Sequence, residues 1–421
     1  MLLTESKMKN KISFLTVVFL SIFMTSCLNN KPANDTRSIV MWEMEDAYVA
    51  PFIDEIITNF KKDYFKKHGI ELNFTRAHYQ TEDLRQQFQA ASLAGVPPDI
   101  IISPSDTAGI YAISGFILPL DKVFDFNLYN KPVVEAITLD NKVWGIPISN
   151  GNHLMLMFNK KFIKEAPKTT DELFKFCDNN LKKYNLDYCL AFDGGEPFWL
   201  MPWLGGFGGW PLDNNKPTLN TPEMKRTLQF YHDLKFKYKY IPPECDYNCM
   251  DSLFKEGKVP FIINGDWAIS SYSEQFKENF GIGLIPEISE AHRYPTPMIS
   301  GRYFLLSSPI SSNTEKFEIV KEFVKFYTNK ENQIKQFKEL KRLPALKEAS
   351  MSKEVLSDPI AKVSMEQILK GKPMPMAYEM RAVWDTVRNY QGLVMTNKMS
   401  IDEATFKMQK EVERKIKEMD R

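Results

Sequence analysis

The stretch Leu253–Ala268, with the sequence LFKEGKVPFIINGDWA, carries the clearest local signals for the fold. Gly257 predicts the end of a helix, because glycine readily adopts the left-handed conformation of a C-terminal cap. The apolar run Val259–Ile263 then predicts a buried strand. Asn264–Trp267 follow as a turn and a large aromatic. Ligands of open α/β sheets bind beyond the carboxyl ends of strands, so Trp267 is a candidate contact, with core packing as an equal alternative.

Strands and helices alternate on both sides of this stretch. Upstream, strands are predicted at Ser38–Trp42, Ile70–Ala77 and Ile100–Ile102, with helices at Ala50–Lys67 and Thr81–Leu93 between them. This order predicts a parallel sheet with helices on its faces. A second α/β pattern follows residue 154, and further helical periods cover 353–370 and 401–419. The sequence therefore predicts an α/β protein with two similar lobes.

Composition restricts the class of protein. The 421 residues suffice for two or more domains, and a hydrophobic content of 43% supports packed cores. The formal net charge is +1, and no block of Lys and Arg with interleaved aromatics occurs. We therefore expect no nucleic-acid partner.

The N-terminus predicts export and attachment to a membrane. Lysines precede Ile12–Phe23, an apolar stretch of signal-peptide length that is short for a bilayer span. Met24–Cys27 resembles a bacterial lipobox, so we expect a signal peptide at 1–26, lipidation of Cys27 and a polar linker at 27–37. The alternatives are an ordinary secretory signal cut nearby, or an anchor left in place.

Four further cysteines follow, and export permits disulfides between them. We expect the local pairing, Cys177 with Cys189 and Cys245 with Cys249, among the three that are possible. Zinc is a weaker alternative, because no second Cys-x3-Cys pair and no histidine follows at ligand spacing. Reduced thiols are the remaining alternative. We expect neither metal nor cofactor.

No enzyme signature is present. The five histidines lie outside nucleophile and metal motifs, and no phosphate-binding or dinucleotide glycine loop occurs. Glu196 and Asp266 could be read as a pair of glycosidase carboxylates, but spare carboxylates occur in any protein. We therefore expect a binding protein rather than an enzyme.

Aromatic residues gather in segments that we expect to be irregular. Trp199 and other rings lie in the Gly- and Pro-rich segment Pro197–Trp210, and six of the seven tryptophans lie at predicted strand ends, turns or irregular segments beside polar residues. Flat rings cover the C–H faces of a sugar while carboxylates and amides bind its hydroxyls. The joint pattern favours a carbohydrate site, with core packing as the alternative for each ring.

Several motifs recur in the order found in one family. They are Gly95–Ile101 (GVPPDII), Ser114–Leu120 (SGFILPL), Lys142–Pro147 (KVWGIP), Leu154–Lys160 (LMLMFNK), and Phe254–Lys258 (FKEGK) with Gly265–Trp267 (GDW). Together they resemble extracellular solute-binding proteins of the maltose-binding-protein type, the carbohydrate receptors of ABC importers. The resemblance covers the whole chain after the signal peptide.

The resemblance implies the type II periplasmic-binding-protein fold, with a ligand cleft between two lobes. It places the N-terminal lobe at 38–149 plus 304–342 and the C-terminal lobe at 154–299 plus 345–421. Hinge segments are expected near 149–153, 299–304 and 341–344. Closure of the lobes on a ligand would shift the hinge equilibrium toward a shape that the importer recognises.

The resemblance and the aromatic pattern give a set of candidate ligand contacts. These are Trp42, Glu43, Asp106, Asn152, His153, Glu196, Trp199, Asp266, Trp267, Arg302 and Trp384. Two positions depart from the family pattern. Asn152 and His153 stand where the maltose receptor has a carboxylate, and Thr107 stands where a basic residue usually follows Asp106. We therefore expect this chain to share the fold of the family but not necessarily the sugar specificity of the maltose receptor.

We accordingly expect a lipid-anchored receptor on the periplasmic or external side of the cell membrane. Its partners would be a sugar or oligosaccharide and the permease subunits of an ABC importer. Alternatives are the same fold binding a polyol, glycerophosphodiester or peptide, and a surface lipoprotein that acts as a sensor or adhesin without transport.

Overall fold

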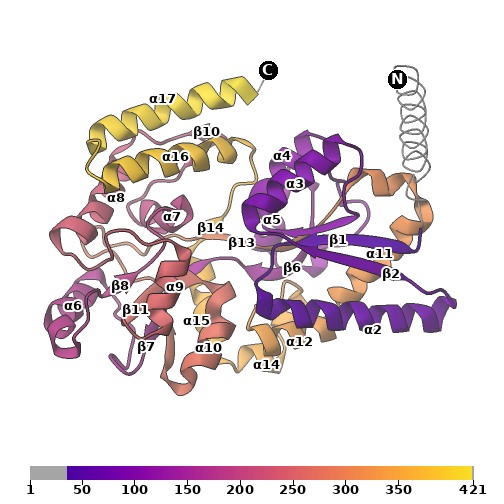
Figure 1. Cartoon of the computed structure of the whole chain (residues 1–421), viewed down its shortest axis with the longest axis horizontal. Helices are drawn as coiled ribbons and strands as arrows, with labels where there is room; N and C mark the ends of the chain where they lie inside the picture. The colour runs from indigo at the N-terminus through magenta and orange to yellow at the C-terminus, as the bar shows by residue number, and fades with distance from the viewer. Residues whose placement is uncertain (1–35, 420–421) are drawn as a thin grey trace, which may run out of the picture.

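The computed structural model describes residues 36–419. The predicted signal peptide, Cys27 and most of the predicted linker lie outside these residues. The described chain forms two α/β lobes that face each other, with the N-terminal residues on the right and the middle of the chain on the left in Figure 1. The predicted two-lobed α/β architecture is thus confirmed.

The first lobe is built around a six-stranded sheet. Its strand order is β14-β13-β3-β1-β2, and β6 pairs with β13. The strands are β1 (Ser38–Glu43), β2 (Asn73–His78), β3 (Ile100–Ser103), β6 (Ile146–Gly151), β13 (Met298–Leu306) and β14 (Lys372–Pro373), with a separate small hairpin of β4 (Thr138–Leu139) and β5 (Lys142–Val143). Helices of this region are α2 (Ala50–His68), α3 (Thr81–Leu93), α4 (Ala108–Ile113), α5 (Lys131–Glu135), α11 (Thr314–Tyr327) and α12 (Lys330–Leu340).

Sequence explains the elements that hold this sheet. In α2, Pro51 lies in the first turn, where its missing N–H costs nothing, and Gly69 ends the helix with φ 69°. The apolar positions of α2 recur at helical spacing and are buried, as at Phe52, Ile56 and Phe60. By contrast, every residue of β3 is buried, because strands lie on both edges of it and its run of isoleucines fills the core.

The second lobe has a smaller, four-stranded sheet. Its order is β12-β7-β11-β8, and β7 runs antiparallel to both β11 and β12. The strands are β7 (Leu154–Asn159), β8 (Leu190–Ala191), β11 (Phe261–Gly265) and β12 (Phe280–Gly283), and β9 (Leu212–Asp213) and β10 (Lys216–Pro217) form a hairpin. The helices are α6 (Thr170–Tyr184), α7 (Pro197–Gly206), α8 (Pro222–His232), α9 (Tyr247–Lys255), α10 (Ile269–Phe276), α16 (Glu379–Met395) and α17 (Ile401–Met419).

Two large cores follow the two sheets. One contains buried residues of 39–148 and 303–345 together with Met376, and the other contains buried residues of 154–298 and 374–412. A third, small core joins Phe337 of α12 to Leu343, Val355 and Ala361. It involves α14 (Lys353–Leu356) and α15 (Pro359–Lys370), which follow α13 (Lys347–Ser350). This small core crosses the boundary predicted near 341–344.

The three segments predicted as hinges lie side by side. Ser149 forms a bridge with Pro344, and the Asn150 N–H donates to the Leu343 carbonyl at 2.9 Å. On the other edge, Gly151 pairs with Ser300 in β13, the strand that runs between the lobes near the centre of Figure 1. The lobe boundaries and the hinge function of these segments stay predictions.

Three local predictions were wrong. Strand β2 begins at Asn73, three residues after the predicted start. The region 353–370 is two helices, since Asp358 caps a new helix at Pro359. The segment Pro197–Trp210, expected to be irregular, begins with the ten-residue helix α7. Pro197 suits the first turn of α7, and tertiary burial of its rings outweighs the cost of the internal Pro202.

The predicted cysteine pairing is confirmed. Cys177 and Cys189 form one disulfide with Cα atoms 5.6 Å apart, and Cys245 and Cys249 form another with Cα atoms 5.2 Å apart. Both distances fit ordinary disulfide geometry. Within residues 36–419, no helix is long and apolar enough to cross a membrane, and no group of His, Cys, Asp and Glu side chains is arranged to hold a metal.

Candidate ligand-binding site

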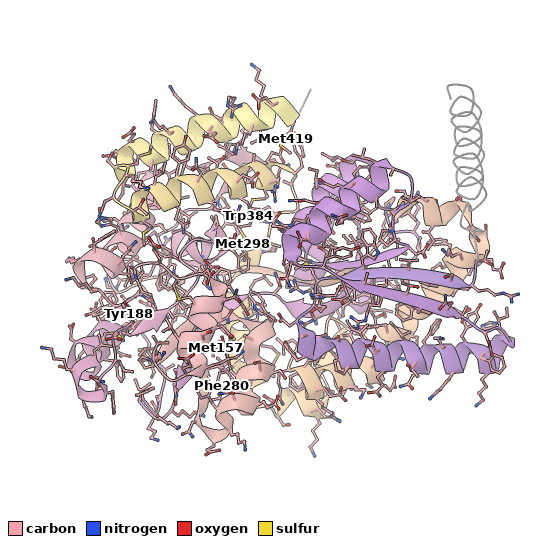
Figure 2. All side chains as sticks on the ribbon, in the orientation of Figure 1. Met157, Tyr188, Phe280, Met298, Trp384 and Met419 are labelled. Carbon is pink, nitrogen blue, oxygen red and sulfur yellow. A yellow bond between two sulfur atoms is a disulfide. The ribbon has the colours of Figure 1, made fainter. Side chains whose placement is uncertain are left out.

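A pocket of about 90 Å³ lies between the two lobes. Its N-terminal side comes from α3, α4 and the single turn Ser105–Thr107, and its C-terminal side comes from α16 through Arg381 and Trp384. Trp384 lies where α16 faces the other lobe (Figure 2). The predicted residues Asp106 and Trp384 thus meet across the cleft, although 278 positions separate them in the chain.

Asp106 is held by an arginine that the sequence analysis missed. Arg85 of α3 donates from one terminal nitrogen to Asp106 Oδ2 at 2.5 Å and from the other to Glu82 Oε1 at 2.6 Å. Burial lowers the pKa of Arg85, but the Asp106 and Glu82 carboxylates outweigh this and hold its pKa above the ordinary value. Arg85 therefore supplies the cation that the sequence lacks at Thr107.

This pair leaves polar atoms for a ligand. Asp106 Oδ1 and Arg85 Nε are buried and have no hydrogen-bond partner within residues 36–419. Buried polar atoms normally have a hydrogen-bond partner, and a buried polar atom without one destabilises the folded protein. An incoming hydroxyl group could donate to Asp106 Oδ1 in the pocket. The pocket also contains Glu82 and Arg381, so its two acids and two bases balance.

Trp384, which lines the pocket, belongs to an aromatic cluster of the C-terminal lobe that we call the aromatic wall: Phe198, Trp199, Tyr247, Trp267 and Trp384. Phe198 is central, with its ring 5.9 Å from Trp199, 6.2 Å from Trp267 and 6.4 Å from Trp384. These separations fall in the range of favourable ring pairs. The structure thus brings together all three tryptophans predicted on this side, and adds Phe198 and Tyr247.

The members of the aromatic wall differ in exposure. Trp267 and Phe198 are half-buried, whereas Trp199 is only 6% exposed and its indole N–H donates to the Ile263 carbonyl at 2.8 Å. Core packing therefore describes Trp199 better than ligand contact. Trp384 is likewise only 5% exposed, but unlike Trp199 it lines the pocket between the lobes. The Trp267 indole N–H donates to the Tyr247 hydroxyl at 3.0 Å, which fixes the orientation of the half-buried ring.

The two lobes touch in this structure. The Tyr48 hydroxyl of the N-terminal lobe donates to the Trp267 carbonyl. Farther along the cleft, the Arg381 and Glu82 side chains lie 3.5 Å apart. These contacts connect the two lobes on the side of the cleft where the pocket beside Trp384 lies.

Trp42 and Glu43 do not join this pocket. Glu43 is 1% exposed, and its carboxylate pairs with Arg76 at 2.6 Å and contacts His78 at 3.2 Å, both on the neighbouring strand β2. The Trp42 ring packs against Tyr79 with centroids 5.0 Å apart. The geometry corrects the expectation for Glu43, because its oxygens are already engaged within the N-terminal lobe.

Four other predicted residues gather where the hinge segments meet. Asn152 has φ 46°, and its N–H donates to Asp266 Oδ2 at 3.1 Å. Arg302 donates to Asn152 Oδ1 at 3.1 Å. His153 is fully buried beside Asp266, and burial lowers its pKa, so the ring is neutral and inaccessible to a ligand. This corrects the expectation that His153 contacts ligand.

A buried acid missed by the sequence analysis completes this cluster. Glu45 lies 3.1 Å from Arg302 and 2.6 Å from Arg342, and it is 3% exposed. Burial raises the pKa of Glu45, but the Arg342 and Arg302 guanidinium groups outweigh burial, so the pKa lies below its ordinary value. Arg302 of β13 is therefore committed to an ion triad with Glu45, which follows β1, and Arg342, which follows α12.

Glu196 lies at the start of α7, beside α16. Both of its carboxylate oxygens accept from Arg388, at 3.1 and 2.9 Å. The Glu196 and Arg388 side chains both remain partly exposed, whereas Glu43 is buried. Glu196 thus keeps access to the cleft side of α16, next to Phe198 and Trp384.

The sequence matches the model of the family described as bacterial extracellular solute-binding protein over residues 55–363. The protein belongs to this family. Members of the family are solute-binding receptors rather than enzymes. The family places this solute-binding protein among extracellular proteins.

Individual relatives are similar over nearly the whole chain. A galactooligosaccharide-binding protein of Bacillus subtilis is 25% identical, covering 93% of this chain and 94% of its own. A maltooligosaccharide ABC transporter solute-binding lipoprotein of Streptococcus pneumoniae is 24% identical, covering 91% of each. The maltose/maltodextrin-binding domain MalE from Bdellovibrio bacteriovorus, solved with maltotriose, is 31% identical with a TM-score of 0.81, covering 90% of this chain and 100% of that domain. The predicted type II periplasmic-binding fold is confirmed.

Proposed function

We propose that this solute-binding protein captures a neutral sugar or oligosaccharide and delivers it to the permease of an ABC importer. The observation that carries the proposal is the composition of the cleft. One side presents the aromatic wall, and the other presents the Asp106–Arg85 pair with buried polar atoms left over. A sugar combines apolar C–H faces with a rim of hydroxyl groups, and it matches both sides at once.

The charge of the cleft narrows the ligand class. Glu82 and Asp106 balance Arg85 and Arg381, so the pocket has no excess of positive charge. A phosphodiester would bind best to a surplus of guanidinium or ammonium groups. The balanced pocket favours a neutral polyhydroxyl ligand. The relatives named above are receptors for galactooligosaccharides and maltooligosaccharides, and they support the same class.

The mechanism that we propose is closure of the two lobes around the ligand. The pocket between the lobes measures only about 90 Å³, so the lobes would move apart to admit a sugar and then close around it less tightly than here. A sugar that contacts Asp106 and Trp267 together gains both contacts only in the closed state. Because a ligand shifts an equilibrium by its difference in affinity for two states, the sugar favours closure, which the permease would then recognise.

The site of action follows from the N-terminal sequence. A signal peptide at 1–26 would direct export, and lipidation of Cys27 would hold the protein on the outer side of the cell membrane. The Streptococcus pneumoniae relative is named as a lipoprotein of an ABC transporter, which supports this proposal. Replacement of Cys27 by Ala should release the protein from the membrane fraction, which a Western blot of fractionated cells would measure.

A sugar panel tests the proposed function directly. Residues 28–421 would be titrated with maltooligosaccharides, galactooligosaccharides, polyols, glycerophosphodiesters and short peptides, with melting temperature and intrinsic tryptophan fluorescence as readouts. We expect one sugar class to raise the melting temperature, because ligands that bind only the folded state stabilise it. Fluorescence should change with the same midpoint, since Trp267 and Trp384 border the cleft. A response to peptides or phosphodiesters alone would overturn the proposal.

A further inference from the structure

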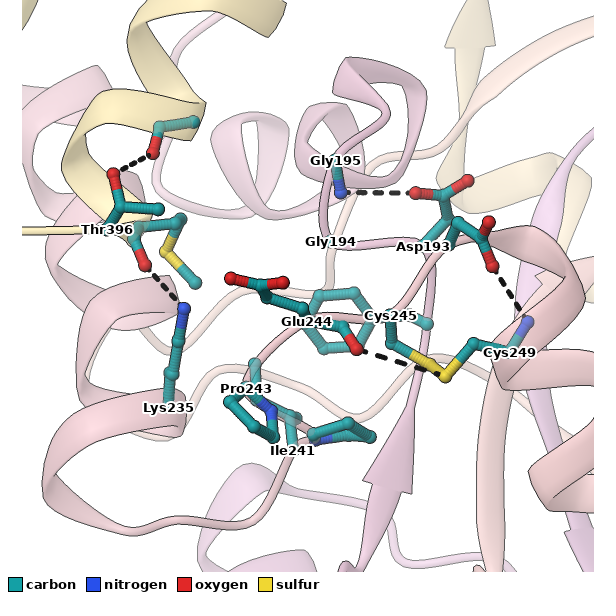
Figure 3. Close-up of a pocket in the computed structure, with 15 residues that line it drawn as sticks. Asp193, Gly194, Gly195, Lys235, Ile241, Pro243, Glu244, Cys245, Cys249 and Thr396 are labelled. Carbon is teal, nitrogen blue, oxygen red and sulfur yellow. Dashed lines mark hydrogen bonds between the residues drawn. A yellow bond between two sulfur atoms is a disulfide. The ribbon is translucent and has the colours of Figure 1, made fainter.

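A second and larger cavity, of about 500 Å³, lies entirely within the C-terminal lobe. Figure 3 shows its walls: the loop of Asp193 and Gly194, the side chain of Lys235, the loop that carries Glu244, and the end of α16 at Thr396. None of its lining residues belongs to the N-terminal lobe or to the pocket described above. A cavity of this size falls within the usual range for a small-molecule site.

The cavity continues the cleft along one helix. Arg381 and Trp384 of α16 line the pocket between the lobes, and Gly392 and Met395 of the same helix line the cavity. Arg388 lies between these two sets, so successive members are three or four residues apart and share one side of the helix. A ligand that runs along α16 from Trp384 would reach the cavity after passing Arg388.

The chain segment opposite α16 also runs from the cleft to the cavity. Glu196 binds Arg388 at 2.9 Å beside the cleft, and the residues just before it, Asp193 to Gly195, line the cavity. The two chain segments that frame the aromatic wall therefore also frame the cavity. The Glu196–Arg388 ion pair therefore lies between the residues that line the cleft and those that line the cavity.

Gly392 is unexplained by packing. Glycine in the middle of a helix destabilises it relative to alanine. A Cβ atom at Gly392 would meet no atom within 4 Å, and its φ is not in the left-handed range, so neither close packing at the Cβ position nor backbone conformation requires glycine here. Its effect is to leave the cavity wall along α16 without a side chain.

The lining of the cavity indicates the chemistry of its ligand. Asp193 accepts the N–H groups of Gly195 and Glu196 at 3.1 and 3.2 Å, and Glu244 is exposed. The Lys235 ammonium group already donates to the Met395 carbonyl. With Asp246, the lining has three acids and one base, which disfavours an anionic ligand. The apolar floor, which includes Phe192 and Ile241, suits the C–H faces of a neutral sugar.

We propose that this cavity is an extension of the ligand cleft that holds the far end of a neutral oligosaccharide whose other end lies against the aromatic wall. The inference rests on the proposed function, because it requires a sugar in the cleft. It adds that the receptor selects for length: a short sugar fills only the cleft, whereas a longer one also fills the cavity.

The test uses Gly392→Phe, because a Cβ atom here would meet no atom within 4 Å and the ring would extend from the cavity wall. Asn389→Phe is the matched control, because Asn389 is an exposed residue of the same helix that lines neither pocket. Both variants and the parent protein would be titrated calorimetrically with maltooligosaccharides and galactooligosaccharides from the disaccharide to the heptasaccharide. We expect Gly392→Phe to weaken binding of the longest ligands by about tenfold or more while the shortest change less than about twofold.

A second variant guards against a structural artefact. Glu244→Ala removes an exposed carboxylate from the opposite wall and should lower affinity for the long ligands alone, by about threefold to tenfold. Asn389→Phe should match the parent at every length. If Gly392→Phe leaves all affinities unchanged, or weakens short and long ligands equally, the extension is wrong while the sugar receptor stands. If the parent binds no sugar of any length, the proposed function itself is wrong.

Discussion

The two sides of the cleft use different chemistry. The N-terminal side offers charged groups on helix α3 and the turn after β3, with Asp106, Arg85 and Glu82 in contact. The C-terminal side offers rings, with Phe198 among Trp267, Trp199 and Trp384. The charged side can form directional hydrogen bonds with hydroxyl groups, and the aromatic side offers an apolar contact surface. Neither side alone matches both features of a sugar. The proposed closure would combine the two sides, and the following predictions separate their contributions.

The largest effect is expected on the aromatic side, for Trp267→Ala. The half-buried indole provides the stacking face beside Phe198, and its loss should weaken sugar binding by more than about tenfold, or at least about 1.4 kcal/mol. Calorimetric titration measures the affinity, and thermal melting gives the stability of the free protein. A large fall in melting temperature with unchanged affinity would identify Trp267 as a core residue instead.

A somewhat smaller effect is expected on the charged side. Asp106→Asn and Arg85→Met should each weaken binding by about 1–2 kcal/mol, because each disturbs a buried, charge-assisted hydrogen bond that orients Asp106 Oδ1. In the double variant the losses should be smaller than their sum, since the two side chains act as one unit. Strict additivity measured by titration would show that Arg85 and Asp106 act independently.

The third prediction concerns the cavity: the free energy of unfolding should depend on pH through Asp193, which lines the cavity and not the cleft pocket. Burial raises the pKa of Asp193 to about 6, so the folded protein keeps a proton that the unfolded chain has already released above its ordinary pKa of 3.8. Stability from this group is therefore present at low pH and is lost as pH rises from about 4 to about 6. Asp193→Asn should remove this loss.

We therefore compare the free energy of unfolding of Asp193→Asn with that of the parent protein. The difference in favour of the variant should grow by about 1 kcal/mol between about pH 4 and pH 6, after allowance for the partial exposure of Asp193. Urea unfolding of both proteins between pH 4 and pH 7 measures the difference. A constant difference across this range would contradict the raised pKa.

The smallest effect concerns the ionic contact across the cleft. Arg381 and Glu82 are 39% and 48% exposed at their side chains, and exposed pairs of this kind contribute about 1 kcal/mol or less. Arg381→Met should favour the open state slightly and raise the sugar dissociation rate about twofold. Stopped-flow fluorescence measures the rate. A change of more than about tenfold would show that Arg381 contacts the sugar directly.

Local elements of this protein are largely predictable from sequence. The helix Thr81–Leu93 has the predicted bounds, and the strand predicted at Val259–Ile263 is present at Phe261–Gly265. The shift of two residues arises because β11 is defined by its pairing with β7, which extends to Leu154. The segment after Pro197 was harder to predict, since its glycines and prolines favour loops whereas burial of its rings stabilises helix α7.

The site shows where sequence reasoning ends. Asp106, Trp267 and Trp384 could be chosen from motif position and residue type, and the local cysteine pairs from their spacing. Arg85 could not, because a lone arginine on an exposed helix pattern carries no signal of its own. Its role depends on a contact with Asp106, 21 residues away, and the contact exists only once α3 lies against the turn after β3.

Residue type and periodicity thus determined most elements and their order, because those features depend on neighbours a few positions apart, and the resemblance of the motifs indicated the family. Tertiary structure alone decided which polar groups remain free for a ligand. Glu43 ends β1 and Asp106 lies in the turn after β3, yet both oxygens of Glu43 contact Arg76 or His78, whereas Asp106 Oδ1 has no hydrogen-bond partner within residues 36–419. The difference arises from partners that the fold brings from elsewhere, and a carboxylate binds a sugar only if its partners leave an oxygen available.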